Sequence, residues 1–271
     1  VDKIAFTGST RTGRRVMEMA AQGIKRVSVE LGGKSANIIL RDADLELALD
    51  GAVFGNFLHS GQVCTSGSRL LIPEDMKDVI LPGLAARVKE LKVGHQLDPR
   101  TRIGPLCNAR QKETVERYIA LGKKEGATVL VGGGTPRVEG FENGFYVEPT
   151  VFTDVKNDMT IAREEIFGPV LCVLTYRTED EAIALANDSD YGLAGGVWSR
   201  DLVRAQAIAS RMRTGTVWIN DYHVFHDHGP FGGFRQSGLG KELGELGLLE
   251  FTQAKHVHVG TEGDPDNKLG H

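Results

Sequence analysis

Cysteine is scarce in this sequence, with only 3 among 271 residues. Cys64, Cys107 and Cys172 lie far apart and form no CxxC pair. An odd, sparse set of this kind argues against a disulfide framework and against a zinc site. We therefore expect no metal centre, and a reducing compartment, the cytoplasm.

Long apolar runs and an excess of basic charge are missing as well. No apolar segment approaches the ~20 residues that a membrane-spanning helix requires. The 32 Lys and Arg against 36 Asp and Glu leave a net charge of −4. Because no apolar run is long enough, we expect no membrane partner. Because Lys and Arg form no basic stripe, we expect no nucleic-acid partner. The remaining composition, 41% hydrophobic and 25% charged residues, is typical of a globular protein with a substantial core.

The order of apolar segments predicts an α/β fold. Runs typical of buried strands cover residues 27–31, 36–40, 69–72, 170–174 and 216–219. Helical patterns follow Asp44 and Asp75, cover residues 108–125, follow a capping box of Thr178 and Glu181, and cover residues 201–212. Strands buried on both faces and separated by helices indicate a largely parallel sheet.

The first residues resemble a strand already in progress. Residues 1–6 show no signal-peptide layout. Because they have the pattern of a strand without its start, we expect the chain to be a piece of a longer protein. Residues 6–13 then predict a strand that gives way to a helix, and the first N–H groups of such a helix can hold phosphate. The segment is not a P-loop, since Arg14-Arg15 replaces the required Lys-Ser/Thr.

Cys64 occupies a loop of small residues, Gly61-Gln62-Val63-Cys64-Thr65-Ser66-Gly67-Ser68-Arg69, between a predicted helix and a predicted strand. Loops held by rigid elements commonly present nucleophiles. The alternative is a structural thiol, because free cysteines are often buried. Cys172, in an apolar strand, and Cys107, beside a helix start, favour the structural interpretation for those two residues.

Two acidic segments are further candidates. Glu30 ends a strand before Gly32-Gly33, where the backbone must bend closely past a neighbour. Its carboxylate is either a solvated strand end or a general base whose pKa is raised by partial burial. Glu164 and Glu165 precede Phe167 and a Gly-Pro turn, a pattern that an ordinary charged loop would also show.

Taken in order, these motifs resemble the aldehyde dehydrogenase superfamily. The resemblance rests on residues 6–9, Glu30-Leu31-Gly32-Gly33-Lys34, Gly61-Gln62-Val63-Cys64, Glu165-Ile166-Phe167-Gly168-Pro169 and residues 230–238. It extends over nearly the whole chain, to about residue 259. It implies that Cys64 attacks an aldehyde and that the thiohemiacetal passes hydride to NAD or NADP. Glu30 would then activate water to release the carboxylic acid from the thioester on Cys64.

The resemblance also implies a cofactor site. Glu165 would hold the nicotinamide ribose, and Phe167 would pack near the nicotinamide ring. Gly8 and Ser9 would lie near the pyrophosphate, and Gly32 beside the nicotinamide. The choice between NAD and NADP, and the identity of the aldehyde, stay open, although Trp218, Tyr222, Phe225 and Phe231 suggest an apolar funnel.

The implied domain organisation has several parts. Residues 1–32 would be the last piece of a dinucleotide-binding domain, 33–236 the catalytic domain and 237–251 a return segment. Residues 252–260 would be the oligomerisation strand of a homo-oligomer, a dimer or tetramer, and 261–271 a flexible tail. The alternating pattern of 252–260 fits an exposed strand that seeks a partner, or else an edge strand of the chain's own sheet.

Most of the family's cofactor sheet and its oxyanion asparagine would precede residue 1. We therefore expect the chain alone to lack dehydrogenase activity, and residues 1–32 to be poorly anchored. Cys64 should have a low pKa and react before the other thiols. Within the family, a CoA-acylating enzyme is disfavoured because Glu30 is present. The alternative to an enzyme is a non-catalytic remnant that keeps the fold and the assembly surface.

Overall fold

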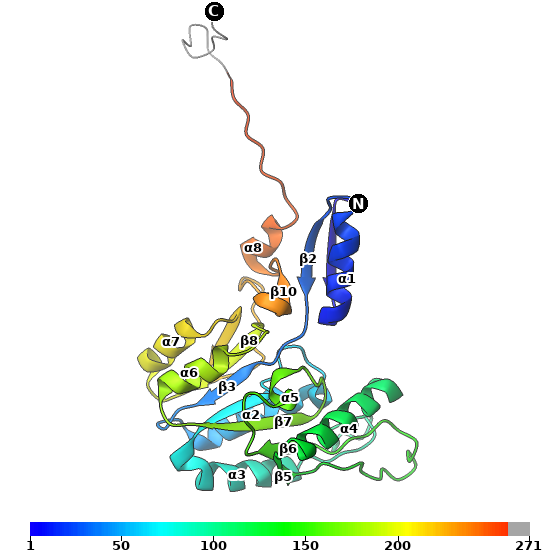
Figure 1. Ribbon diagram of the computed structural model, residues 1–271, viewed down its shortest axis with the longest axis vertical. Coiled ribbons are helices and arrows are strands. Elements are labelled where there is room, and N and C mark those ends of the chain that lie inside the picture. Colours follow the sequence, from blue (N-terminus) through cyan, green and yellow to red (C-terminus); the bar gives the residue numbers. More distant parts are fainter. Residues whose placement is uncertain (260–271) are drawn as a thin grey trace, which may run out of the picture.

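The computed structural model describes residues 1–259. A seven-stranded sheet with its helices forms the larger body, and a three-stranded sheet stands beside it (Figure 1). No helix in this part of the chain is both long and apolar enough to cross a membrane.

The larger sheet has the strand order β5-β6-β7-β4-β3-β8-β9. Its strands are β3 (Ala36–Ile39), β4 (Arg69–Pro73), β5 (Thr128–Val131), β6 (Thr150–Thr153), β7 (Val170–Tyr176), β8 (Ala194–Trp198) and β9 (Thr216–Ile219). All neighbouring strands are parallel except β5 and β6 at one edge. The predicted α/β fold with a largely parallel sheet is thus confirmed.

Helices cover both faces of this sheet. They are α2 (Leu45–Phe57), α3 (Lys77–Lys89), α4 (Ala109–Lys124), α5 (Thr160–Arg163), α6 (Glu179–Asn187) and α7 (Leu202–Arg211), with short 3-10 turns η1 (Leu58–Gly61), η2 (Glu74–Met76) and η3 (Arg235–Ser237). Neighbouring side chains of β3 point to opposite faces. Ile38 therefore packs in the core with α4, α6 and α7, whereas Ile39 packs with α2 and α3.

The helix starts follow from side-chain caps. The side chains of Asp44, Asn108, Thr178 and Asp201 each accept a hydrogen bond from the backbone N–H three residues later. At α6 only half of the predicted capping box forms, since the Glu181 carboxylate accepts from the N–H of Arg177, at 2.7 Å, and not from the N–H of the cap residue Thr178. The predicted helices at 108–125 and 201–212 are confirmed to within a residue or two.

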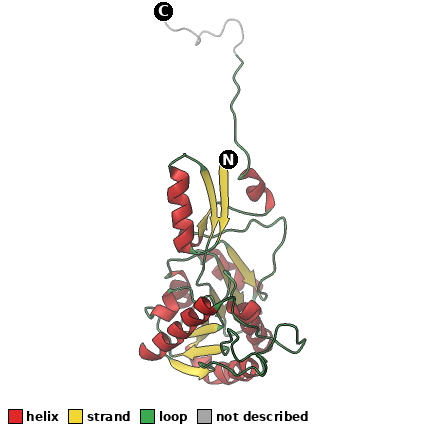
Figure 2. Ribbon diagram, turned by 90° about the vertical axis from the view of Figure 1, so that its right-hand side faces the viewer, coloured by secondary structure: helices red, strands yellow, loops and turns green. Residues whose placement is uncertain are grey.

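The smaller sheet has the order β1-β2-β10, with β1 (Lys3–Thr7) parallel and β10 (Gly238–Leu239) antiparallel to β2 (Arg26–Glu30). Helices α1 (Thr10–Ala21) and α8 (Gly244–Leu249) flank its strands on opposite sides (Figure 2). Within the described residues β1 has no partner on its outer side, so this edge is open.

Residues 1–32 make contacts that the expectation of poor anchoring did not include. The chain returns from the larger body, pairs β10 with the end of β2 and places Glu250 over the first strands. Lys3 Nζ lies 2.8 Å from Glu250 Oε2, and Arg26 donates to the Glu250 carbonyl oxygen at 2.9 Å. These contacts join the first two strands to the segment that ends at Glu250.

Residues 252–259 form no strand and are exposed, and they run away from both sheets (Figure 1). The alternative of an edge strand in the chain's own sheet is therefore wrong. An oligomerisation strand at 252–260 stays a prediction, since its partner would be a second chain. Residue 260 and the expected tail at 261–271 lie outside the described residues, and the domain boundaries at 32 and 236 also stay predictions.

Candidate active site

The turn that carries Cys64 joins η1 to β4. Its backbone closes through a hydrogen bond from the Ser66 N–H to the Val63 carbonyl oxygen, at 3.1 Å. Gly61 has a φ of 72°, and a Cβ atom there would lie 2.1 Å from the Gly168 carbonyl oxygen. Because only glycine fits such an approach, the Cys64 turn packs directly against the Gly-Pro turn before β7.

Gly32 and Gly33 bring the acidic segment and the cysteine turn together. A Cβ at Gly32 would lie 2.1 Å from Glu165 Oε2, and one at Gly33 would lie 2.6 Å from the Cys64 carbonyl oxygen. The Gly33 N–H donates to Glu165 Oε1 at 3.1 Å. The two glycines therefore allow motifs that are distant in sequence to meet at one point.

Glu30 is buried at the end of β2, with 4% of its surface exposed. Neither carboxyl oxygen has a hydrogen-bond partner among the described residues, and a Cβ at Gly232 would lie 2.6 Å from Oε1. Burial, and next the charge of Glu242, raise the pKa of Glu30 to about 8, although Lys241 acts in the opposite direction. The interpretation of Glu30 as a solvated strand end is therefore wrong.

The thiol of Cys64 is half-buried, whereas Cys107 is exposed and Cys172 is buried. Burial raises the pKa of Cys64 to about 11, and the charges of Glu165 and Glu30 act in the same direction. The expectation of a low pKa for Cys64 is therefore wrong, because burial first and the charges of Glu165 and Glu30 next disfavour the thiolate.

The neighbouring acids Glu164 and Glu165 have different surroundings. Glu164 accepts a hydrogen bond from the Tyr118 hydroxyl at 2.5 Å, away from the cysteine turn. Burial raises the pKa of Glu165, while the Gly33 N–H and the charge of Lys34 lower it. Of the two, Glu165 is the acid that faces the Cys64 turn.

Phe167 lies beside this point with 37% of its surface exposed and a φ of 55°. Gln111, in the first turn of α4, donates from Nε2 to the carbonyl oxygens of Ile166 and Phe167, at 3.0 and 2.8 Å. Left-handed backbone is uncommon for a bulky residue, so such contacts must hold it. The sequence did not single out Gln111, and no local pattern marks it.

Ser9 and Glu165 line one cleft of about 400 Å³ between α1 and the larger body. Ser9 caps α1, with its Oγ accepting from the Thr12 N–H at 3.3 Å. Gly8 lies just before the helix and donates to the Glu30 carbonyl oxygen at 3.0 Å. The free N–H groups at the start of a 12-residue helix favour an anion at this cleft.

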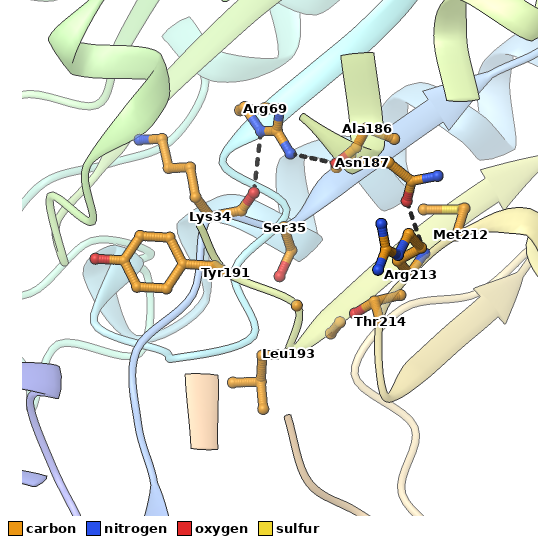
Figure 3. A pocket seen from close by; sticks show the side chains of 13 residues that line it. Lys34, Ser35, Arg69, Ala186, Asn187, Tyr191, Leu193, Met212, Arg213 and Thr214 are labelled. Carbon is orange, nitrogen blue, oxygen red and sulfur yellow. Dashed lines mark hydrogen bonds between the residues drawn. The ribbon is translucent and has the colours of Figure 1, made fainter. Parts of the chain in front are cut away.

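Lys34 and Arg69 are buried basic residues that line one small cavity (Figure 3). All three guanidinium nitrogens of Arg69 are bonded, donating to the carbonyl oxygens of Lys34, Leu185 and Ala186 and to Asn157 Oδ1. Lys34 Nζ has no partner among the described residues, and burial lowers its pKa. The cavity drawn beside them measures only about 20 Å³, which is room for about one water and not for an aldehyde or a nucleotide.

A second open cavity of about 400 Å³ is lined by Trp218, Phe225 and Phe231. The ring of Phe225 meets those of Trp218 and Phe231 edge-on, at 5.5 and 5.4 Å between centroids. Tyr222 does not belong to this funnel. It is buried in the core and donates its hydroxyl hydrogen to the Thr65 carbonyl oxygen at 3.0 Å.

Lys241 and Glu242 are the site residues that the sequence missed most clearly. They reach Glu30 because β10 pairs with the end of β2, and Lys241 Nζ donates to the Gly232 carbonyl oxygen at 2.8 Å. The only feature of the sequence that could have indicated them is their position shortly after the 230–238 motif. In residues 1–259 no group of three His, Cys, Asp or Glu side chains is placed to share a metal ion.

Comparison with known proteins points in one direction. The model of the Aldehyde dehydrogenase family matches residues 1–257. Betaine aldehyde dehydrogenase of Bacillus subtilis is 47% identical over 262 residues, covering 97% of this chain and 54% of that protein. The enzyme of the same name from Brucella anthropi is 46% identical over 257 residues, covering 95% and 53%.

Solved structures agree with these relatives. Betaine aldehyde dehydrogenase from Staphylococcus aureus in complex with NAD+ superposes with a TM-score of 0.93 at 46% identity, covering 95% of this chain and 51% of that one. An aldehyde dehydrogenase from Bacillus cereus in complex with NAD+ gives 0.90 at 47% identity, covering 93% and 51%. The chain spans about half the length of the relatives it matches.

Proposed function

Because the chain belongs to the aldehyde dehydrogenase family, we propose that it serves the oxidation of an aldehyde to a carboxylic acid with NAD as cofactor. Cys64 is the nucleophile in this proposal and Glu30 the general base. The observation that carries it is the meeting of three motifs at Gly32-Gly33, where Glu165 and the Cys64 turn approach within contact distance. We propose the same division of the chain at residues 32 and 236.

The covalent steps follow from the groups present. Cys64 Sγ forms a bond to the aldehyde carbon while the carbonyl π bond becomes a lone pair on an oxyanion, and the thiol proton passes to solvent water. In this proposal the backbone N–H of Cys64 donates a hydrogen bond to the oxyanion. NAD, if bound in the cleft lined by Ser9 and Glu165, would supply the hydride acceptor, and Cys64 would carry the acyl group as a thioester.

Glu30 suits the second half-reaction. Thioester hydrolysis needs a base within reach of one water molecule, and a base works best when its pKa lies near the working pH. The pKa of Glu30, raised to about 8 by burial and by Glu242, meets that condition. A working base at this position supports water, and not CoA, as the acceptor of the acyl group.

The cleft between α1 and the larger body fits the cofactor. The helix start at Ser9 suits the pyrophosphate, and Glu165 suits the ribose hydroxyls as a hydrogen-bond acceptor. Gly32 leaves room that any side chain would fill, and Phe167 offers an exposed ring for the nicotinamide. The relatives' complexes favour NAD over NADP, and an aldehyde such as betaine aldehyde is the first substrate to test.

The proposal is tested with a fusion protein, in which the N-terminal half of the Bacillus subtilis relative is joined to this chain. The chain alone should show no dehydrogenase activity, because losing a single oxyanion donor typically costs about 10²–10³ in rate. The joined protein should bind NAD in calorimetry and oxidise members of an aldehyde panel, and its Cys64→Ser variant should bind NAD without oxidising them. Saturable NAD binding speaks against a non-catalytic remnant, and oxidation by the Cys64→Ser variant would overturn the assignment.

A further inference from the structure

Thr65, the residue after Cys64, is held at both its backbone and its side chain. It is 1% exposed, and its Oγ1 lies 3.1 Å from His223 Nδ1. The hydroxyl of Tyr222 donates to the Thr65 carbonyl oxygen at 3.0 Å. Two consecutive residues after β9 therefore fix the central part of the turn that carries Cys64.

The direction of the bond between Thr65 and His223 follows from the other ring nitrogen. His223 Nε2 lies 3.0 Å from the Gly55 carbonyl oxygen, which can only accept, so Nε2 carries a hydrogen. Burial lowers the pKa of His223, and the ring is therefore neutral near neutral pH. Nδ1 is then an acceptor, and the Thr65 hydroxyl must donate to it.

The same Gly55 carbonyl oxygen also accepts the Gly67 N–H at 3.0 Å. Helix α2 is thus joined at one atom both to His223 and to the end of the cysteine turn. On the opposite side, the Cys64 carbonyl oxygen leaves no room for a Cβ at Gly33. The turn is therefore held from two directions, one of which depends on the side chain of Thr65.

Backbone strain is retained at this point. His223 has a φ of 61°, in the left-handed region that non-glycine residues rarely adopt. Its neighbour Tyr222 fills a slot formed by three glycines, where a Cβ at Gly55, Gly67 or Gly196 would lie about 3 Å from its side chain. Such a conformation persists only because the surroundings enforce it, which is common where a functional group must be aimed.

We propose that His223 is a positioning residue, which accepts the Thr65 hydroxyl hydrogen and thereby holds the Cys64 turn toward Glu30 and Glu165. The proposal rests on the proposed role of Cys64 as nucleophile. His223 touches neither the thiol nor the carboxyl groups of the site in the described contacts. Its one direct side-chain contact with the turn is the bond to Thr65, and Gly55 links it to the turn indirectly.

The test measures iodoacetamide alkylation of Cys64, Cys107 and Cys172 in the 271-residue chain by peptide mass spectrometry. Thr65→Val keeps the shape and removes the donor, so the turn loosens and water reaches the thiol. Cys64 alkylation should then rise about three- to tenfold, because exposure returns the thiol pKa toward its ordinary value. Thr65→Ser keeps the hydroxyl and should restore the slow rate.

A double variant decides whether the bond itself is responsible. Thr65→Val combined with His223→Phe should alkylate no faster than the faster single variant, since both remove one interaction. An unchanged Cys64 rate in Thr65→Val would contradict the proposal. An equal rise at Cys172 would contradict it too, because that buried thiol reports loosening of the whole fold. Neither result bears on the nucleophile, which the Cys64→Ser variant of the joined protein tests independently.

Discussion

At the residue scale, the chemistry depends on acids that the fold has taken out of water. Glu30 is buried and Glu165 is partly buried, and this loss of hydration raises the pKa of each. Their charges in turn raise the pKa of Cys64. The site thus keeps its thiol protonated at rest, and the reaction must remove that proton when the aldehyde is bound.

Burial of Glu30 should be measurable as pH-dependent stability. Its folded pKa is raised from 4.5 to about 8, so the folded state holds a proton that the unfolded state releases. The contribution of Glu30 to the free energy of unfolding is therefore greatest at low pH and is lost as the pH rises through about 8. Glu30→Gln should therefore stabilise the chain by roughly 1–3 kcal/mol at about pH 9 and hardly at all at about pH 4.

Urea unfolding at the two pH values checks this prediction. Glu139→Gln, a change at an exposed acid, is the matched control and should have no effect at either pH. Equal stability of Glu30→Gln and the parent chain at high pH would show that the Glu30 carboxylate is hydrated.

At the element scale, capping residues determine where helices begin, and tertiary contacts determine which neighbouring segments those helices bind. The cap at Asn108 starts α4 and so places Gln111 against the Phe167 backbone. Asn108→Ala should destabilise the chain by about 1 kcal/mol, because the Gln111 N–H loses its acceptor.

Thermal or urea unfolding measures that loss, with two comparisons. Asn108→Asp keeps an acceptor and should stay near the parent chain, and Asn143→Ala, at an exposed loop position, should be neutral. If Asn143→Ala lost as much stability as Asn108→Ala, the cap would not be the cause.

The same distinction explains how much of the structure was predictable. Strands such as β4 and β7, and the capped helices, follow from patterns of a few residues. The structure brings the segment after Glu30 against Glu165 and the Cys64 turn, while the roles of these residues stay predictions. The two-residue pairing of β10 with β2 has no local signal, so Lys241 and Glu242 could not be placed beside Glu30. Tyr222 was assigned to a funnel because an aromatic sequence pattern does not distinguish a lining residue from a buried one.

At the scale of the whole molecule, the exposed residues 252–259 should mediate assembly. An extended, exposed segment with alternating side chains can pair with a strand of a second chain. Deleting residues 252–271 should convert an oligomer to a monomer in light scattering, whereas deleting 261–271 should leave the mass of the assembly unchanged. An oligomer that survives the longer deletion would place the interface elsewhere.

The proposed roles of Cys64 as nucleophile and Glu30 as general base are tested most directly by rapid mixing of the joined protein. With Glu30→Gln, the formation of NADH on mixing with aldehyde and NAD should show a burst of about one equivalent per site. Slow turnover should follow, because the thioester on Cys64 waits for unactivated water. Normal turnover, or no burst at all, would contradict the account and give Glu30 another role.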